Sequence, residues 1–437
     1  MKKRILIAFA ALFCALSIFA QEENLGKVKM TLEEAKKIAL EQNPTIARAQ
    51  ASIDAAMAAI DTARSAYLPS LDLNAGITRL RDNATRPNRD FDNTTSYELG
   101  LSASWLVFDG FARRFRKLSA ELGGERAIAA CDDAKRLLIE QVAYAYYNVL
   151  QAQNSMNISQ EDAEFNKILK EDAQKKYELG ASKRSEVLNF EYQVQSAEAN
   201  YVISKRSWRV AWISLGHLLN IQQDDIWDSL ELVSPAESDV ENNFPTLSEM
   251  MAYASENRPD LKAARQAVEV AELSVKTAKA AWYPTIAAFG NYGYDRTHSA
   301  HFNKHYDRSI NYGLKASWNL FDGLNTQANI KQAQADLIVA QKNLEECEIA
   351  VESEIRQNRL ALEASWEVLK KEDSLLEVAT QIRDLVKEEY DGGTATITRV
   401  NEAETNLNDT KMARSNAWIS VLNAFETLSS AVGYNLK

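Results

Sequence analysis

Two stretches of the sequence carry nearly the same eight residues, ASWLVFDG at residues 103–110 and ASWNLFDG at residues 316–323. Up to the tryptophan of each stretch, from Tyr97 and from Ile310 on, apolar residues alternate with mostly small or polar ones, and an Asp-Gly pair follows. Alternation with a period of two is typical of a β-strand with one apolar face, and Asp-Gly favours a turn. The two stretches therefore predict two copies of one strand that ends at a turn.

Further residues match on both sides of these stretches at an almost constant separation. The matching pairs are Pro44 with Pro259, Tyr67 with Trp282, Pro69 with Pro284, Tyr177 with Tyr390, and Gly180 with Gly393. The separation is 215 residues for the first three pairs and 213 for the last two, so the second copy has lost two residues. The sequence thus predicts a tandem duplication, with a first repeat at 21–219, an acidic linker at 220–245 and a second repeat at 246–437.

Each repeat contains two strand-like segments, which predict one β-hairpin at about residues 70–108 and another at about 285–321. Apolar residues alternate along them, for example Leu71, Leu73 and Ile77, or Ile310, Tyr312, Leu314, Ala316, Trp318 and Leu320. Strands of about ten residues with one apolar face and aromatic residues near their ends are typical of a transmembrane β-barrel. A half-buried sheet in a soluble protein shows a similar pattern.

The period becomes helical after each Asp-Gly pair. Residues 111–219 and 324–432 predict two long helical hairpins, which reverse near Gly180 and Gly393. Along the first hairpin, Ala134, Leu138, Val142, Ala145 and Val149 follow steps of four and three, as a coiled coil requires. The chain has only 15 glycines and 7 prolines among 437 residues, less than half of the roughly 12% of average usage. Few turns are therefore expected, between long elements.

The N-terminus reads MKKR followed by ILIAFAALFCALSIFA. A basic start and an apolar run too short to cross a bilayer predict a secretory signal peptide at residues 1–20, with which Cys14 is removed. No other run reaches the roughly 18 apolar residues of a transmembrane helix. The mature chain is therefore expected to be either soluble outside the cytoplasm or a membrane β-barrel.

Charge and motif content exclude several classes of function. The chain has 50 basic and 61 acidic residues and a net charge of −11, which argues against a nucleic-acid partner. The three cysteines, Cys14, Cys131 and Cys347, fit neither a disulfide framework nor a CxxC spacing. The phosphate-loop, HExxH and GxSxG motifs are absent from the sequence, so neither an enzyme nor a cofactor is predicted.

Three of the four histidines, His298, His301 and His305, fall in the loop of the second predicted hairpin, near Asp295. Histidine and aspartate can both ligate zinc. Because an exposed hairpin loop fixes no ligand geometry, solvated polar side chains are favoured there over a metal site.

Four strands cannot close a barrel, and an open sheet edge in lipid would leave backbone groups unpaired at several kcal/mol each. If the hairpins lie in a membrane, the chain must therefore form a ring with other copies. The long helices would continue that ring outside the bilayer as a hollow tube.

The sequence resembles the TolC-type outer-membrane efflux proteins, the outer membrane factor family. The resemblance rests on the opening Thr-Leu-Glu-Glu-Ala at residues 31–35, on Asn43-Pro44, on the two Trp-x-x-Phe-Asp-Gly segments, and on Tyr177-x-x-Gly180 with Tyr390-x-x-Gly393. It covers essentially the whole mature chain. The order, duplication and spacing of these motifs are more specific than any one of them.

The resemblance implies a homotrimer with a 12-stranded β-barrel in outer-membrane lipid, continued by a periplasmic α-helical barrel. It implies a passive exit duct of a tripartite efflux or type I secretion system. An inner-membrane efflux pump or ABC exporter would supply the energy, and a periplasmic adaptor (membrane fusion) protein would link the two. The alternative is a periplasmic coiled-coil scaffold without a pore, which leaves the four amphipathic strands unexplained.

The resemblance further implies that the helix reversals at Gly180 and Gly393 form a periplasmic tip, which is closed at rest and contacts the adaptor. In the family, an acidic residue after the first reversal is linked to a tyrosine and an arginine at the second. Glu186 and Tyr390 occupy matching positions here, but Ala395 stands where the arginine is expected. Arg399, which corresponds to Glu186 in the second repeat, leads to the hypothesis of a substitute Glu186–Arg399 clasp. Two solvated charges are the alternative.

Overall fold

The computed structural model describes residues 28–82, 92–221, 229–237, 245–297, 301–304 and 307–433. The predicted signal peptide with Cys14 lies outside the described residues, as does most of the acidic linker. Within the described ranges, no helix combines the length and the apolar character needed to cross a bilayer.

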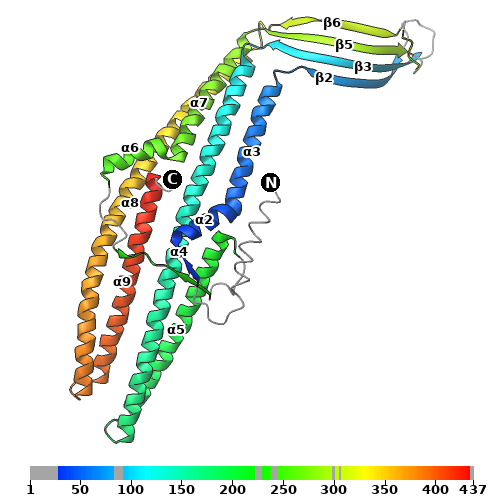
Figure 1. Ribbon diagram of the computed structural model, residues 1–437. Coiled ribbons are helices and arrows are strands. Elements are labelled where there is room, and N and C mark those ends of the chain that lie inside the picture. Colours follow the sequence, from blue (N-terminus) through cyan, green and yellow to red (C-terminus); the bar gives the residue numbers. More distant parts are fainter. Residues whose placement is uncertain are drawn as a thin grey trace. The chain divides into compact units, whose positions relative to one another are not determined.

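The two repeats contain the same elements in the same order (Figure 1). The first has α2 (Leu32–Gln42), α3 (Pro44–Ser65), β2 (Ser70–Asp82), β3 (Asp92–Phe108), α4 (Ala112–Glu178) and α5 (Arg184–Leu219). The second has α6 (Leu247–Asn257), α7 (Pro259–Lys279), the 3-10 turn η3 (Ala280–Trp282), β5 (Thr285–Thr297), β6 (Arg308–Ser317), α8 (Asn325–Asp391) and α9 (Ile397–Val432). Helices α4 and α8 have 67 residues each, and α5 and α9 have 36 each. Helices α4 and α5 form a long helical hairpin in the first repeat, and α8 and α9 form one in the second.

Both repeats open with the same helix start. The Glu34 carboxylate accepts a hydrogen bond from the Thr31 backbone N–H at 2.8 Å, and the Glu249 carboxylate accepts one from Thr246 at 2.8 Å. These capping boxes satisfy backbone donors that a helix N-terminus leaves unpaired. The bond from the threonine backbone lowers the pKa of each glutamate.

The four long strands form one antiparallel sheet in the order β2-β3-β5-β6 (Figure 1). The pairing places the apolar residues of all four strands on one face, because Leu73 lies opposite Leu101, Leu101 opposite Tyr292, and Tyr292 opposite Ile310. The other face carries mainly Ser, Asn, Asp, Gly and Glu side chains. Large apolar side chains on the first face are exposed in the single chain, including Leu71, Leu73, Ile77, Tyr312 and Leu314.

Strand β6 ends at Ser317, four residues before the predicted end of the second hairpin. Ser317 is paired with Thr285, the first residue of β5, so beyond it β6 has no opposite residue within the chain. The equivalent strand β3 continues to Phe108 because β5 borders it on its second side. The strand pattern through Trp318 and Leu320 is therefore not realised in a single chain.

Each Asp-Gly pair turns the chain from a strand into a long helix. Gly110 has a φ of +65° and Gly323 a φ of +67°, a region that glycine adopts without strain. The preceding aspartates cap the helices: Asp109 accepts a hydrogen bond from the backbone N–H of Arg113 at 2.9 Å, and Asp322 accepts one from that of Thr326 at 2.8 Å.

The apolar seam predicted along the first long helix is buried at Leu138, Val142 and Val149, which are at most 4% exposed. Cys131 is buried in the same helix. Gly124 does not interrupt α4. The methyl carbon of Ile60 on α3 lies 3.0 Å from the position of a Cβ at Gly124, so the glycine allows α3 to approach closely.

The chain forms two compact units, and each combines segments of both repeats. One contains Arg48–Asp133 and Ser255–Val351, with the four-stranded sheet, and the other contains the remaining segments, with the helix reversals.

The unit with the helix reversals holds a small sheet that the sequence pattern did not reveal, β1 (Val28–Met30) parallel to β4 (Leu230–Leu232). The Tyr146 hydroxyl donates to the Met30 carbonyl at 2.7 Å, and burial raises its pKa to about 12. Part of the predicted linker, including Glu231, is thus a strand, whereas Asp224, Asp225 and Asp228 lie outside the described residues.

Candidate functional site

The two helix reversals have the same backbone geometry. Gly180 and Gly393 have φ values of +75° and +78°. The N–H of Gly180 donates to the Tyr177 carbonyl and that of Ala181 to the Lys176 carbonyl, and the second reversal repeats this pattern. These are Schellman turns, in which a left-handed glycine lets the last helical carbonyls find donors. Both glycines therefore serve the reversals to which the sequence assigned them.

A small apolar core lies beneath the reversals. It brings together all four helices of the two hairpins through Leu169, Ala173, Val187, Phe190, Val386, Val400 and Ala403. Phe190 of α5 is fully buried. The core holds the two hairpin ends together. The charged residues of both turns are therefore attached to one packed group of helices.

Tyr390 packs against this core at the end of α8. The Lys176 ammonium nitrogen lies 4.4 Å from the centroid of its ring, which is a favourable cation–π distance. Burial raises the pKa of Tyr390, and the negative charge of Glu186 raises it further. The structure therefore brings the predicted residues Glu186 and Tyr390 into one electrostatic environment.

Glu186 and Arg399 occupy equivalent places in the first turns of α5 and α9. The Glu186 carboxylate accepts a hydrogen bond from the Ser182 hydroxyl. Arg399 is exposed. Among the residues that the structure describes, no ion pair joins the Arg399 guanidinium to Glu186 within the chain. The predicted clasp is therefore not formed in the single chain.

The charge of Arg399 is unusual for its position. A cation near a helix N-terminus opposes the helix dipole, whereas Glu186 at the same position of α5 agrees with it. Arg399 is thus locally unfavourable by a few tenths to about 1 kcal/mol at an exposed site. This local cost is consistent with a function outside its own helix.

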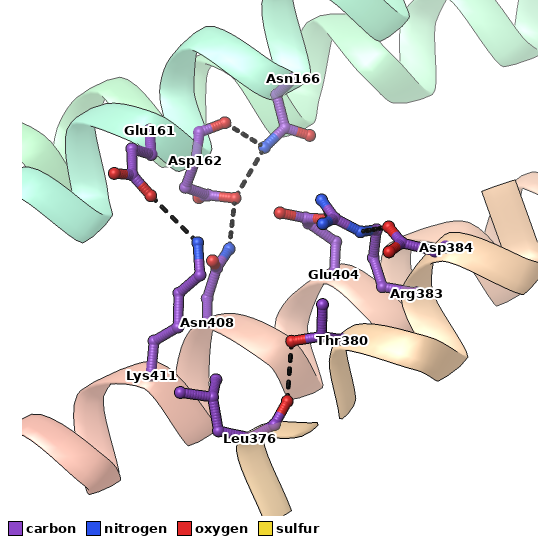
Figure 2. A network of polar contacts seen from close by, with 10 residues as sticks. All are labelled: Glu161, Asp162, Asn166, Leu376, Thr380, Arg383, Asp384, Glu404, Asn408 and Lys411. Carbon is purple, nitrogen blue, oxygen red and sulfur yellow. Dashed lines mark hydrogen bonds and ion pairs between the residues drawn. The ribbon is translucent and has the colours of Figure 1, made fainter. Parts of the chain in front are cut away.

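A polar network lies between the two hairpins and joins residues of α4, α8 and α9 (Figure 2). The Asp162 carboxylate on α4 accepts hydrogen bonds from Asn166 at 3.0 Å and from Asn408 of α9 at 2.9 Å. Lys411 of α9 also contacts Glu161 of α4, with a nitrogen–oxygen distance of 3.0 Å. These contacts tie α9 to α4 through polar groups at a helix seam that is otherwise apolar.

Glu404 of α9 is the most deeply buried acid of this network, at 7% exposure. Its Oε2 lies 3.7 Å from the Arg383 guanidinium of α8, which itself donates to Asp384 at 2.7 Å. A polar cavity of about 440 Å³ borders Asp162 and Glu404. Sequence reasoning missed this network, because Asp162 and Glu404 are far apart in the chain and neither belongs to a recognisable motif.

Burial raises the pKa of both Asp162 and Glu404 above the ordinary value of each carboxyl group. For Glu404, Arg383 opposes this effect and Asp162 adds to it. A carboxyl whose pKa is higher in the folded state binds a proton more tightly there than in the unfolded chain. The proton bound by such a carboxyl therefore stabilises the folded state most at low pH. This stabilisation is lost as the pH rises through the folded-state pKa.

We expect the change Glu404→Gln to raise the melting temperature at pH 7.5 by roughly 2 °C, because the amide mimics the protonated acid. The difference from the unchanged protein should shrink when melting is followed at pH 5. The matched control is Glu191→Gln, 213 residues earlier, because Glu191 is half exposed and pairs with Lys170 at 3.2 Å. A pH-independent effect of Glu404→Gln, or an equal effect of Glu191→Gln, would contradict the prediction.

The predicted histidine loop is only partly described. His298 and His305 lie outside the described residues, so the preference for solvated side chains over a zinc site stays a prediction. Within the described ranges, no group of three or more His, Cys, Asp or Glu side chains is placed to hold a metal ion.

Comparison with known proteins places this architecture in a family. The profile of the outer membrane efflux protein family matches residues 36–220 and 251–434, one segment in each repeat. The chain belongs to the outer membrane efflux protein family. The outer membrane protein TolC of Vibrio cholerae is 24% identical over 99% of this chain and 96% of its own length. The TolC protein of Escherichia coli is 25% identical over 99% of this chain and 87% of its own length.

Solved structures of outer membrane channels share the fold of this chain. The CmeC outer membrane channel of Campylobacter jejuni superposes with a TM-score of 0.81 at 20% identity, over 92% of this chain and 85% of its own. The predicted fold class, long coiled-coil helices combined with barrel strands in a tandem repeat, is confirmed. The predicted location, the outer membrane with a large helical extension in the periplasm, follows from membership of the family.

Proposed function

We propose that the chain is the outer-membrane duct of a tripartite efflux or type I secretion system. In this proposal three copies close a 12-stranded barrel and the helical hairpins continue it as a periplasmic tunnel. Substrates enter passively from an inner-membrane pump or ABC exporter through a periplasmic adaptor. The observation that carries the proposal is the sheet of β2, β3, β5 and β6, whose apolar face is exposed and whose edge strands β2 and β6 have one paired side each within the chain.

Two features support a channel over a scaffold. A scaffold built from the helices alone would have no use for an exposed apolar sheet face, whereas lipid covers such a face in a barrel. Both edges of the sheet also need partners, since unpaired backbone groups in lipid are costly. The same motifs, from the capping boxes to the glycine turns, occur in both repeats, in the same order relative to the strands.

We further propose that Gly180, Glu186, Tyr390, Gly393 and Arg399 form the gate at the periplasmic tip. Support comes from the shared apolar core, from the effect of the Glu186 charge on Tyr390, and from the unfavourable position of Arg399 in its helix. In the ring, Arg399 would find an acidic partner on an adjacent hairpin end, with Glu186 as the candidate. An exposed pair of this kind contributes only about 0–1 kcal/mol, but three copies would act together on one opening.

We expect Glu186→Ala and Arg399→Ala each to increase single-channel conductance in planar bilayers severalfold, because either change removes one side of the clasp. Lys183→Ala is the control, since Lys183 is an exposed charge in the same reversal that has no proposed partner. Conductance equal to that of the unchanged channel in both clasp variants would refute the clasp. It would leave the proposal of a channel standing.

A further inference from the structure

The joint between the two repeats is seen once within the chain, where β3 pairs with β5. Ala103 lies opposite Gly290, and Leu101 lies opposite Tyr292. Beside this pair of strands, the first strand-to-helix turn packs against the start of the second hairpin. The position of a Cβ at Gly110 is 2.6 Å from the Ala280 carbonyl oxygen and 2.8 Å from the Tyr283 Cβ. A side chain at Gly110 would collide with both atoms.

The second repeat has the same turn, but its surroundings are different. Gly323 shares the positive φ of Gly110, yet within the described part of the chain no atom outside the glycine and its two neighbours lies within 4 Å of the position of its Cβ. Strand β6, which corresponds to β3, has β5 on one side only and ends early, at Ser317. The partner that β5 and Tyr283 supply to the first repeat is thus missing for the second.

The repeat itself identifies what should fill this place. Strand β5 (Thr285–Thr297) corresponds to β2 (Ser70–Asp82), 215 residues earlier with both ends in register. Ala280 corresponds to Ser65, and Tyr283 to Leu68. In the described chain, Leu68 is 69% exposed, and β2 is the opposite edge of the sheet. The two incomplete surfaces of the chain are therefore the two halves of one joint.

We propose that β2 of a second copy pairs antiparallel with β6, with Ala75 opposite Ala316, and that Leu68 of that copy packs against Gly323. The proposal rests on the proposed closed ring and specifies which residues join its subunits. The register is obtained by transferring the β3–β5 pairs to the equivalent residues. It extends β6 beyond Ser317, because Trp318 then lies opposite Leu73 and Phe321 opposite Leu71.

The side chains brought together by this register fit one another. On the apolar face, Leu314 lies opposite Ile77. A slip by one residue would move a whole apolar set onto the polar face, so neighbouring registers are excluded. The pattern that predicted a strand up to residue 321 is then realised in the assembled ring.

The polar face adds a complementary charge across the joint. Within one chain, Gly76 on β2 lies opposite Glu98 on β3, and the Glu98 carboxylate lies 3.9 Å from the position of a Cβ at Gly76. The proposed register places Lys315 of the neighbouring copy on the other side of Gly76. Neither Glu98 nor Lys315 has an ion-pair partner among the residues that the structure describes. Glycine between them leaves room for the carboxylate and the ammonium group to meet.

Cysteine pairs test the register. In a background with Cys131→Ala and Cys347→Ala, the pair Ala75→Cys with Ala316→Cys is oxidised in outer-membrane fractions and run on non-reducing denaturing gels. We expect covalent dimers and trimers, because residues directly opposite on paired strands are within the Cα separation of a disulfide. The matched control is Ala103→Cys with Gly290→Cys, the equivalent pair within one chain, which should stay monomeric on the gel.

The pair Ile77→Cys with Ala316→Cys tests a shift of two residues and should give no covalent oligomer. The register would be overturned if the trimer forms but the Ala75 and Ala316 cysteine pair gives no covalent dimers or trimers. It would also be overturned if the shifted pair gives them. In both cases the proposed channel would stand. A chain that forms no trimer at all would overturn both.

A charge exchange gives an independent test. Lys315→Glu should lower the temperature at which the trimer dissociates on unboiled gels, and the combination of Lys315→Glu with Glu98→Lys should restore it. Circular dichroism of each purified variant checks that the helices form. Equal dissociation temperatures for the single exchange and the unchanged protein would contradict the proposed contact.

Discussion

Replacing Lys36 with methionine is expected to destabilise the unit that holds the helix reversals by about 3–5 kcal/mol, because a buried carboxylate then loses its cation. The Lys36 Nζ lies 3.1 Å from both carboxylate oxygens of Glu426. Both side chains are almost fully buried, with about a tenth of their surface exposed (11% and 10%). Thermal and urea unfolding of the purified protein, followed by circular dichroism, would measure the loss.

The pH dependence of this loss has a defined sign. Burial raises the pKa of Glu426, and Lys36 opposes that rise. Without the lysine the folded-state pKa should rise further, so that the variant recovers stability as the pH falls and the carboxyl binds a proton. The loss should therefore be largest at neutral pH and above.

Two further variants isolate the buried charge. Lys36→Met combined with Glu426→Gln should recover much of the stability, since no unpaired charge is then buried. Lys342→Met is the control for loss of an ion pair as such, because Lys342 and Glu345 are both well exposed, and it should change stability by less than about 1 kcal/mol. A loss for Lys36→Met no greater than that of the control would contradict the account.

Truncating Phe190 to alanine should open the apolar core beneath the helix reversals. Phe190 is fully buried there between both hairpins. Deleting a buried phenylalanine side chain typically costs about 3–5 kcal/mol, because the site collapses only partly. The hairpin ends should separate more readily, and we expect faster hydrogen exchange in α5 and α9 near the reversals together with increased single-channel conductance.

Leu179→Ala serves as the control at the same end of the molecule, because Leu179 at the first reversal is 84% exposed. It should leave both readouts nearly unchanged. Normal exchange and conductance in the Phe190→Ala variant would show that the apolar core does not hold the hairpin ends together.

The periodic features of the fold could be predicted from the sequence. The change from a period of two to a helical period after Asp109-Gly110 and Asp322-Gly323 places the ends of the strands and the starts of the long helices. The glycines at the reversals mark positions with positive φ, which few other residues adopt. These patterns are local in the sequence, and each of them occurs in both repeats.

Contacts that depend on packing between distant segments could not be predicted. Lys36 and Glu426 come from opposite ends of the chain, and α2 and α9 show no local sign that they meet. In the sequence, the buried Glu404 is indistinguishable from other charged residues of a long helix, because Arg383 of α8 and Asp162 of α4 come close to it only in the folded chain. Strand β6 shows the reverse case, because its pattern predicts residues that pair only when another chain is present. The Glu186–Arg399 clasp stays a prediction for the same reason.

The most direct test of the account is gel migration of outer-membrane fractions, unboiled against boiled. We expect a slow, heat-sensitive species near three times the monomer mass, found in the outer-membrane fraction and converted to monomer by boiling. A monomer in the soluble periplasmic fraction would contradict the closed channel and favour a periplasmic coiled-coil scaffold.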